Sequence, residues 1–184
     1  MVCFIPVLEV LEVPAVLVFF ILVLSERKNF MKNTKFIVQA AIIGALYATL
    51  TILLAPISYG QLQVRVAEAL TILPVFTPAA IPGLFIGCIV ANLYGGYGIV
   101  DIVFGSLATL VAAYLTHKVS KRFLAPLPPV IINAIVVGFI LYYVSHLPLV
   151  ITIVWVGLGE AIACYGLGYP LMLILDKYKT RIFR

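Results

Sequence analysis

Long, nearly uncharged apolar segments run through this chain, and they decide what it can fold into. Hydrophobic residues make up 64% of the sequence and charged residues only 10%, whereas ordinary soluble domains carry about 25% charged residues. A soluble chain of 184 residues still exposes much of its surface to water and needs polar groups to cover it. The composition therefore predicts an integral membrane protein.

Turn residues and charges divide the apolar sequence after Lys35 into six stretches. We expect transmembrane helices at about residues 35–56, 62–77, 79–94, 101–120, 127–145 and 149–176. The second and third stretches are short for a membrane span, which needs about 20 residues, and prolines bracket them. The predicted fold class is all-α: a polytopic bundle of six transmembrane helices.

The first thirty residues read differently from the rest. Glu9, Glu12 and two prolines precede a short apolar stretch, whereas Met31 is followed by polar and basic residues and then by a long apolar helix. We expect residues 1–30 to be an N-terminal extension, either a mis-assigned start or an extra helix. Residues 31–184 are expected to form the six-helix transmembrane domain.

Basic residues predict the orientation of this bundle. Of the ten Lys and Arg residues after Met31, nine fall on the side that holds both ends of the six-helix domain, and Arg65 is the exception. Cytoplasmic loops of membrane proteins carry an excess of Lys and Arg. We therefore expect both termini in the cytoplasm and a multi-pass protein of the cell membrane, in contact with the lipid bilayer.

Three acidic residues, Glu68, Asp101 and Glu160, fall within or beside the predicted spans. A charge at membrane depth costs roughly 2.5–3.5 kcal/mol on insertion scales and usually faces a cavity or a partner. The topology places these acids and several other polar residues in the outer half of the bundle, which predicts a ligand pocket open to the exterior. The candidate ligand-binding residues are Glu160, Glu68, Asp101, Arg65, Asn92, Asn133 and Gln61.

Structural roles remain open for several of these residues. Arg65 and Glu68 are spaced to form an ion pair on one helix face. Asp101 is placed to cap its helix, and Glu160 to form a hydrogen bond between helices. The chain has no zinc-ligand spacing, nucleotide-binding loop or nucleophile–base pair. We therefore expect no enzyme activity, no metal or cofactor in this chain and no nucleic-acid partner.

Residues 61–74, QLQVRVAEALTILP, resemble the Q-x-R-x-x-E-A-L-x-x-L-P stretch of the QueT family of queuosine-precursor transporters. Supporting similarities are Gly87 with Asn92, the segment 95–101, Asn133 and Gly159-Glu160. The resemblance covers nearly the whole chain from Met31. It implies a substrate-binding subunit, or S component, of an energy-coupling factor (ECF) importer, with six helices and a ligand near the outer face.

The resemblance also implies partners and a substrate. The partners would be a transmembrane coupling protein and two ATPase subunits, which would use the ATP. The substrate would be a precursor such as preQ1, 7-aminomethyl-7-deazaguanine. A carboxylate can accept two adjacent N–H groups of its guanine-like edge, so we expect Glu160 there and Asp101 or Glu68 at the ammonium group.

Small residues of the first helix would meet the coupling protein in a family of this type. The expected contacts are Ala41, Gly44, Ala45 and Ala48, although such spacings also serve packing within one molecule. Three other functions remain open: an S component for another vitamin or nucleobase, a stand-alone small membrane transporter or channel, and a structural or assembly subunit that binds no ligand.

Overall fold

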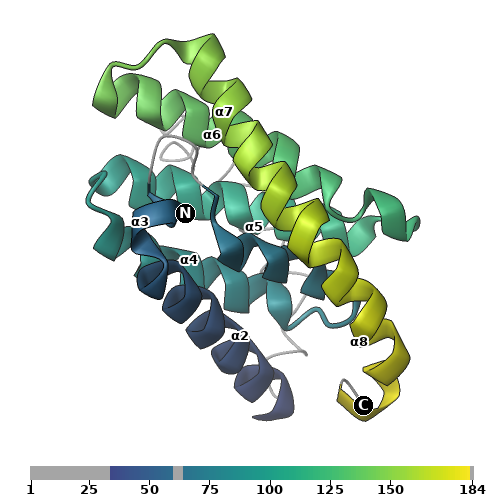
Figure 1. The fold of residues 1–184 in the computed structure, drawn as a ribbon. Helices are drawn as coiled ribbons and strands as arrows, with labels where there is room; N and C mark the ends of the chain where they lie inside the picture. Colours follow the sequence, from purple (N-terminus) through teal and green to yellow (C-terminus); the bar gives the residue numbers. More distant parts are fainter. Residues whose placement is uncertain (1–33, 60–63, 183–184) are drawn as a thin grey trace, which may run out of the picture. The chain divides into compact units, whose positions relative to one another are not determined.

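A computed structural model describes residues 34–59 and 64–182 (Figure 1). All regular elements in these ranges are helices, and three helices are long and apolar enough to cross a membrane: Thr34–Leu53, Arg122–Ser145 and Leu149–Lys179. The chain is therefore an all-α membrane protein. The predictions for residues 1–30 and for Gln61 lie outside the described residues. Residues Ile37–Arg184 form one compact unit.

Most helical elements overlap the six predicted stretches, whereas η3 lies between the fourth and the fifth and α3 extends past the end of the first. Two of the short elements, η1 and η3, are 3₁₀-helices, whereas η2 and η4 are π-helical and continue directly into α-helices. In chain order the elements are α2 (Thr34–Leu53), α3 (Ala55–Ser58), η1 (Val66–Val75), α4 (Ala80–Gly95), η2 (Asp101–Gly105), α5 (Ser106–Lys118), η3 (Arg122–Leu124), α6 (Leu127–Ser145), α7 (Leu149–Ala161), η4 (Ile162–Gly168) and α8 (Tyr169–Ile182).

The second predicted helix differs most from expectation. Its described part is a 3₁₀-helix that begins at Val66, and Arg65 precedes it in extended backbone with φ −85° and ψ 94°. Arg65 and Glu68 therefore do not share a helix face. A 3₁₀-helix rises about 2.0 Å per residue, so ten residues reach about 20 Å, compared with about 15 Å for an α-helix.

Helices α2 and α4 approach closely because glycines face each other at their crossing. A Cβ atom added to Gly44 of α2 would lie 2.8 Å from the carbonyl oxygen of Gly83, and one added to Gly87 of α4 would lie 2.6 Å from that of Gly44. Such distances leave no room for a side chain, and small residues at this contact bring the two backbones together.

The four predicted coupling residues divide between two faces of α2. Gly44 and Ala48 are buried, whereas Ala41 and Ala45 are exposed. Gly44 therefore serves the packing of α2 against α4 within the molecule. Contact with a coupling protein stays a prediction, and the exposed pair Ala41 and Ala45 is the part of the set that is accessible for it.

Two basic segments meet at one end of the unit. Arg122 of η3 forms an ion pair with Asp176 of α8, and the Nζ atom of Lys179 lies 3.4 Å from the other carboxylate oxygen of Asp176. Figure 1 shows α7 and α8 as one long helical rod that leads to this end. We call Lys118, Lys121, Arg122, Lys177 and Lys179 the basic end.

Candidate functional site

Six of the predicted site residues are almost completely buried. They come from the segment ahead of η1, from η1 itself, and from α4, η2, α6 and α7. Because these elements are far apart in the sequence, the fold rather than local sequence assembles the group, which we call the polar cluster. Its members and their exposed fractions are Glu68 (0%), Asn92 (1%), Asp101 (2%), Asn133 (2%), Glu160 (4%) and Arg65 (5%).

Glu68 lies at the centre of the polar cluster. Its Oε1 atom accepts a hydrogen bond from the hydroxyl group of Tyr47 on α2, which is completely buried. The side-chain amide of Asn133 interacts with the carboxyl groups of both Glu68 and Glu160. The structure thus connects α2, η1, α6 and α7 through polar side chains.

Arg65 supplies a buried guanidinium group beside these acids. The group lies over the ring of Tyr59, with 5.5 Å from Cζ to the ring centroid, and its Nη1 atom is 3.9 Å from Cys88 Sγ. It interacts electrostatically with Glu68 and Asp101. No ion pair between described residues joins Arg65 to Glu68, so the structural pair that their spacing suggested is not formed.

Asp101 and Asn92 occupy space that a glycine leaves free. The Nδ2 atom of Asn92 donates to the backbone oxygen of Asp101 at 3.0 Å. A Cβ atom on Gly105 would lie 2.7 Å from Asp101 Oδ1 and 2.9 Å from Asn92 Nδ2. The helix already begins at Ile99, so Asp101 lies inside it and is not the cap that its position suggested.

Four oxygen atoms of the polar cluster are buried and have no hydrogen-bond partner among the described residues: Glu68 Oε2, Asn92 Oδ1, Asp101 Oδ2 and Asn133 Oδ1. Buried polar atoms in proteins are normally paired, so such a concentration in one place is unusual. All four atoms are acceptors, and a ligand rich in N–H groups would satisfy them. Among the described residues, no three His, Cys, Asp or Glu side chains are arranged to hold a metal ion.

Two cysteines belong to the site although no sequence motif pointed to them. Cys88 accepts hydrogen bonds from Asn92 at 3.5 Å and from Thr109 at 3.3 Å. Cys164 lies 3.8 Å from Glu160 Oε2. Each cysteine is four residues from a polar-cluster residue along one continuous helical segment, and side chains at that spacing are neighbours. This spacing is the feature of the sequence that could have indicated the two cysteines.

Tyr59, which follows α3, connects that end of the chain segment to α4 and to the loop after α4. Its hydroxyl donates to the backbone oxygen of Ala91 at 2.5 Å, and Tyr97 donates to the backbone oxygen of Tyr59 at 2.6 Å. Burial raises the pKa of Tyr59, and the positive charge of Arg65 opposes that shift. The hydroxyl therefore stays protonated and remains a donor. Gly95 leaves room for the ring, because its Cβ atom would lie 2.5 Å from Tyr59 Cε1.

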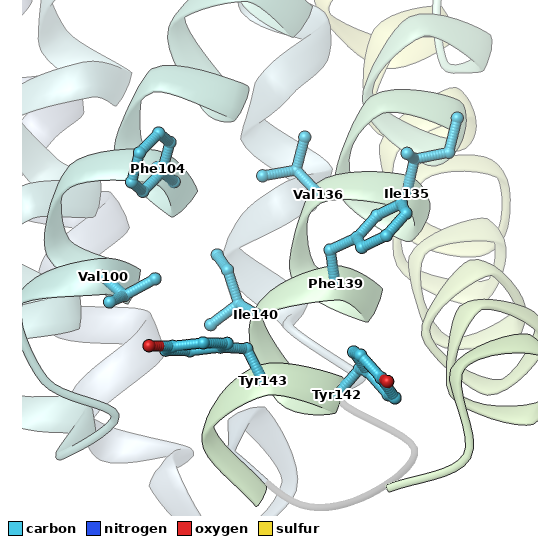
Figure 2. Close-up of a pocket in the computed structure, with 8 residues that line it drawn as sticks. All are labelled: Val100, Phe104, Ile135, Val136, Phe139, Ile140, Tyr142 and Tyr143. Carbon is cyan, nitrogen blue, oxygen red and sulfur yellow. The ribbon is translucent and has the colours of Figure 1, made fainter. Parts of the chain in front are cut away.

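A second region, the apolar hollow, lies on η2 and α6 (Figure 2). Its volume is about 380 Å³ and no charged side chain lines it. Several of its side chains are exposed, including Phe104, Phe139 and Tyr143, as expected for a surface against lipid. The lining residues are Val100, Phe104, Ile135, Val136, Phe139, Ile140, Tyr142 and Tyr143.

Comparison with known proteins identifies the family. The family model described as QueT transporter matches residues 37–177. A curated relative, the queuosine precursor transporter QueT of Lactococcus lactis subsp. cremoris, is 39% identical over 97 residues, which cover 50% of this chain and 57% of the relative. The aligned part thus spans little more than half of that protein. No solved structure matches the chain. Because the family model covers most of its length, this chain belongs to the QueT transporter family.

Proposed function

We propose that this protein captures a queuosine precursor, such as preQ1, as the S component of an ECF-type importer. The observation that carries the proposal is the set of four unpartnered acceptor oxygens beside a buried arginine. preQ1 carries ring N–H groups, an exocyclic amino group and an ammonium group. It therefore offers the hydrogen-bond donors that these oxygens need.

The polar cluster suggests how the ligand would be bound. Glu160 would accept the two adjacent donors of the guanine-like edge, and Glu68 or Asp101 would contact the ammonium group. Arg65 would donate to the ring carbonyl. The stacked pair of Arg65 and Tyr59 offers a flat surface for the planar ring.

The position of the polar cluster fits capture from outside the cell. Helix α5 runs from the glycine beside Asp101 to Lys118 of the basic end, a length of 13 residues or about 20 Å. If the basic end is cytoplasmic, as the distribution of Lys and Arg predicts, the polar cluster lies toward the outer face of the cell membrane.

Energy for uptake would come from other subunits. The loaded S component would bind a transmembrane coupling protein, with Ala41 and Ala45 on the exposed face of α2 as contacts. Two ATPase subunits would then drive a reorientation that opens the polar cluster to the cytoplasm. Uptake of radiolabelled preQ1 by cells should require the coupling proteins, and uptake without them would favour a stand-alone transporter.

Binding of preQ1 to Glu160→Gln protein in lipid nanodiscs tests the site. Loss of a charge-assisted hydrogen bond should weaken binding by about 10- to 100-fold. Asp176→Asn is the matched control, because Asp176 pairs with Arg122 at the basic end, and its affinity should equal that of the wild type. Unchanged affinity in a folded Glu160→Gln variant would remove Glu160 from the site.

A further inference from the structure

Glu68 and Glu160 form a pair of buried carboxyl groups that one amide connects. They lie on different elements, η1 and α7, and Asn133 of α6 interacts with both. Both acids are buried, and Cys164 contacts both residues: its Sγ atom lies 3.6 Å from the backbone oxygen of Glu68 and 3.8 Å from Glu160 Oε2. Two neighbouring carboxyl groups that are both removed from water cannot both ionise at low cost, and such pairs commonly hold one proton between them.

A proton shared by Glu68 and Glu160 would give the unpartnered oxygen of Asn133 a hydrogen-bond donor. Asn133 Oδ1 is buried, and no residue in the described part of the chain forms a hydrogen bond with it. A carboxylate can only accept hydrogen bonds, whereas a protonated carboxyl group can also donate one. If Glu68 or Glu160 carries the proton, its O–H group can donate to Asn133 Oδ1, while Asn133 Nδ2 donates to the other, ionised partner.

The balance of charges in the polar cluster also favours a bound proton. Arg65 is its one cation and faces three acids: Glu68, Asp101 and Glu160. With every acid ionised, two negative charges would remain uncompensated at membrane depth, where charges are costly. Within the described ranges, the other titratable groups that interact with Glu68 or Glu160 are Tyr47 of α2, Cys88 of α4 and Cys164 of η4, which add no positive charge.

We propose that Glu68 and Glu160 share one proton in the unliganded protein and exchange it for the ammonium group of the ligand. The proton leaves to bulk water as the cation enters, so the charge of the polar cluster stays the same. Both carboxylates then accept N–H groups of the ligand. A 7-deazaguanine with an uncharged arm expels no proton and binds more weakly. This inference rests on the proposed function for the identity of its ligand.

Calorimetry tests the exchange directly. Binding enthalpies of preQ1 at neutral pH, measured in buffers with different ionisation enthalpies, should show release of about one proton per ligand. The 7-cyano analogue, which lacks the ammonium group, should release almost none. Asp176→Asn should behave as the wild type, and Glu160→Gln should release no proton. Equal proton release with both ligands, or none with preQ1, overturns the exchange.

Infrared spectroscopy of the unliganded protein gives a test that needs no ligand. A protonated carboxyl group has a C=O stretching band that a carboxylate lacks. We expect this band in the wild type and in Asp176→Asn, and its loss in the double variant Glu68→Gln/Glu160→Gln. Absence of the band in the wild type overturns the shared proton. A protein that shows the band but binds neither ligand contradicts the proposed function while retaining the shared proton.

Discussion

The polar cluster and the apolar hollow use the same two elements, η2 and α6, in opposite ways. Asp101 and Asn133 are buried and carry oxygens without hydrogen-bond partners. Phe104 and Phe139, one turn or two away on the same elements, are half exposed and line the hollow. Its volume of about 380 Å³ falls in the usual range for ligand pockets. The contrast shows that a hollow of ligand size can lack polar groups altogether, and it makes the unsatisfied buried acceptors the feature on which the proposed site rests.

Glu68→Gln should weaken preQ1 binding as much as Glu160→Gln does, because it removes a charge at the centre of the polar cluster. The amide would keep the size of the side chain but replace the unpartnered Oε2 acceptor. A charge-assisted hydrogen bond contributes about 1.5–3 kcal/mol, so affinity should fall by about 10- to 100-fold. Calorimetry on nanodisc-embedded protein measures this, and wild-type affinity would argue that the ligand binds elsewhere.

Gly105→Ala should weaken binding by about tenfold, because overpacking of this size costs about 1–3 kcal/mol. The new methyl group would lie 2.7 Å from Asp101 Oδ1 and displace the carboxylate. Gly166→Ala is the matched control, since a Cβ atom there meets no atom within 4 Å. If both variants bind preQ1 equally well, the site does not depend on the space that Gly105 leaves free for Asp101.

Tyr47→Phe should have a smaller effect, about two- to tenfold, because it removes one hydrogen bond to Glu68 that contributes about 0.5–1.5 kcal/mol. The matched control is Tyr143→Phe in the apolar hollow, where the side chain is 71% exposed. Affinities measured side by side should separate the two regions. A Tyr143 effect as large as that of Tyr47 would contradict the division between them.

Phe139→Ala should leave preQ1 affinity unchanged, because the side chain lines the apolar hollow and has no polar atom to bind the ligand. Calorimetry checks the affinity, and thermal unfolding in nanodiscs checks that the variant is folded. A clear loss of binding in a folded variant would mean that the hollow contributes to the site, and the two regions would then act as one.

The membrane class and the helical stretches could be predicted because lipid imposes strong constraints. Long apolar runs must be helical to satisfy their backbone groups, and the stretch 127–145 has the bounds of α6. The 3₁₀ geometry of η1 could not be predicted. In a ten-residue apolar segment, periods of about 3.0 and 3.6 residues per turn differ too little to be told apart.

The members of the polar cluster could be proposed because a polar side chain within an apolar span needs a protein partner. Their proximity in the structure follows from the same constraint, while their roles in binding stay predictions. Tyr47 could not be proposed, because one tyrosine in an apolar helix has no distinguishing neighbours in the sequence. Tyr94 and Tyr143 are exposed, whereas Tyr59 is the aromatic residue beside Arg65, and its position in the sequence does not distinguish it from them.

The π-helical turn η4, residues Ile162–Gly168, affects how related sequences should be aligned. A π-turn holds one residue more than an α-turn. Every later side chain is therefore rotated by about 100° around the helix axis, compared with an uninterrupted α-helix of the same sequence. Met172, which is completely buried, should keep its orientation if that extra residue is deleted and the turn becomes α-helical, because the π-turn is what absorbs the extra residue. Homologues with a one-residue gap between positions 160 and 172 should therefore have an uninterrupted α-helix there and keep the apolar pattern after the gap, and homologues without the gap should keep the π-turn.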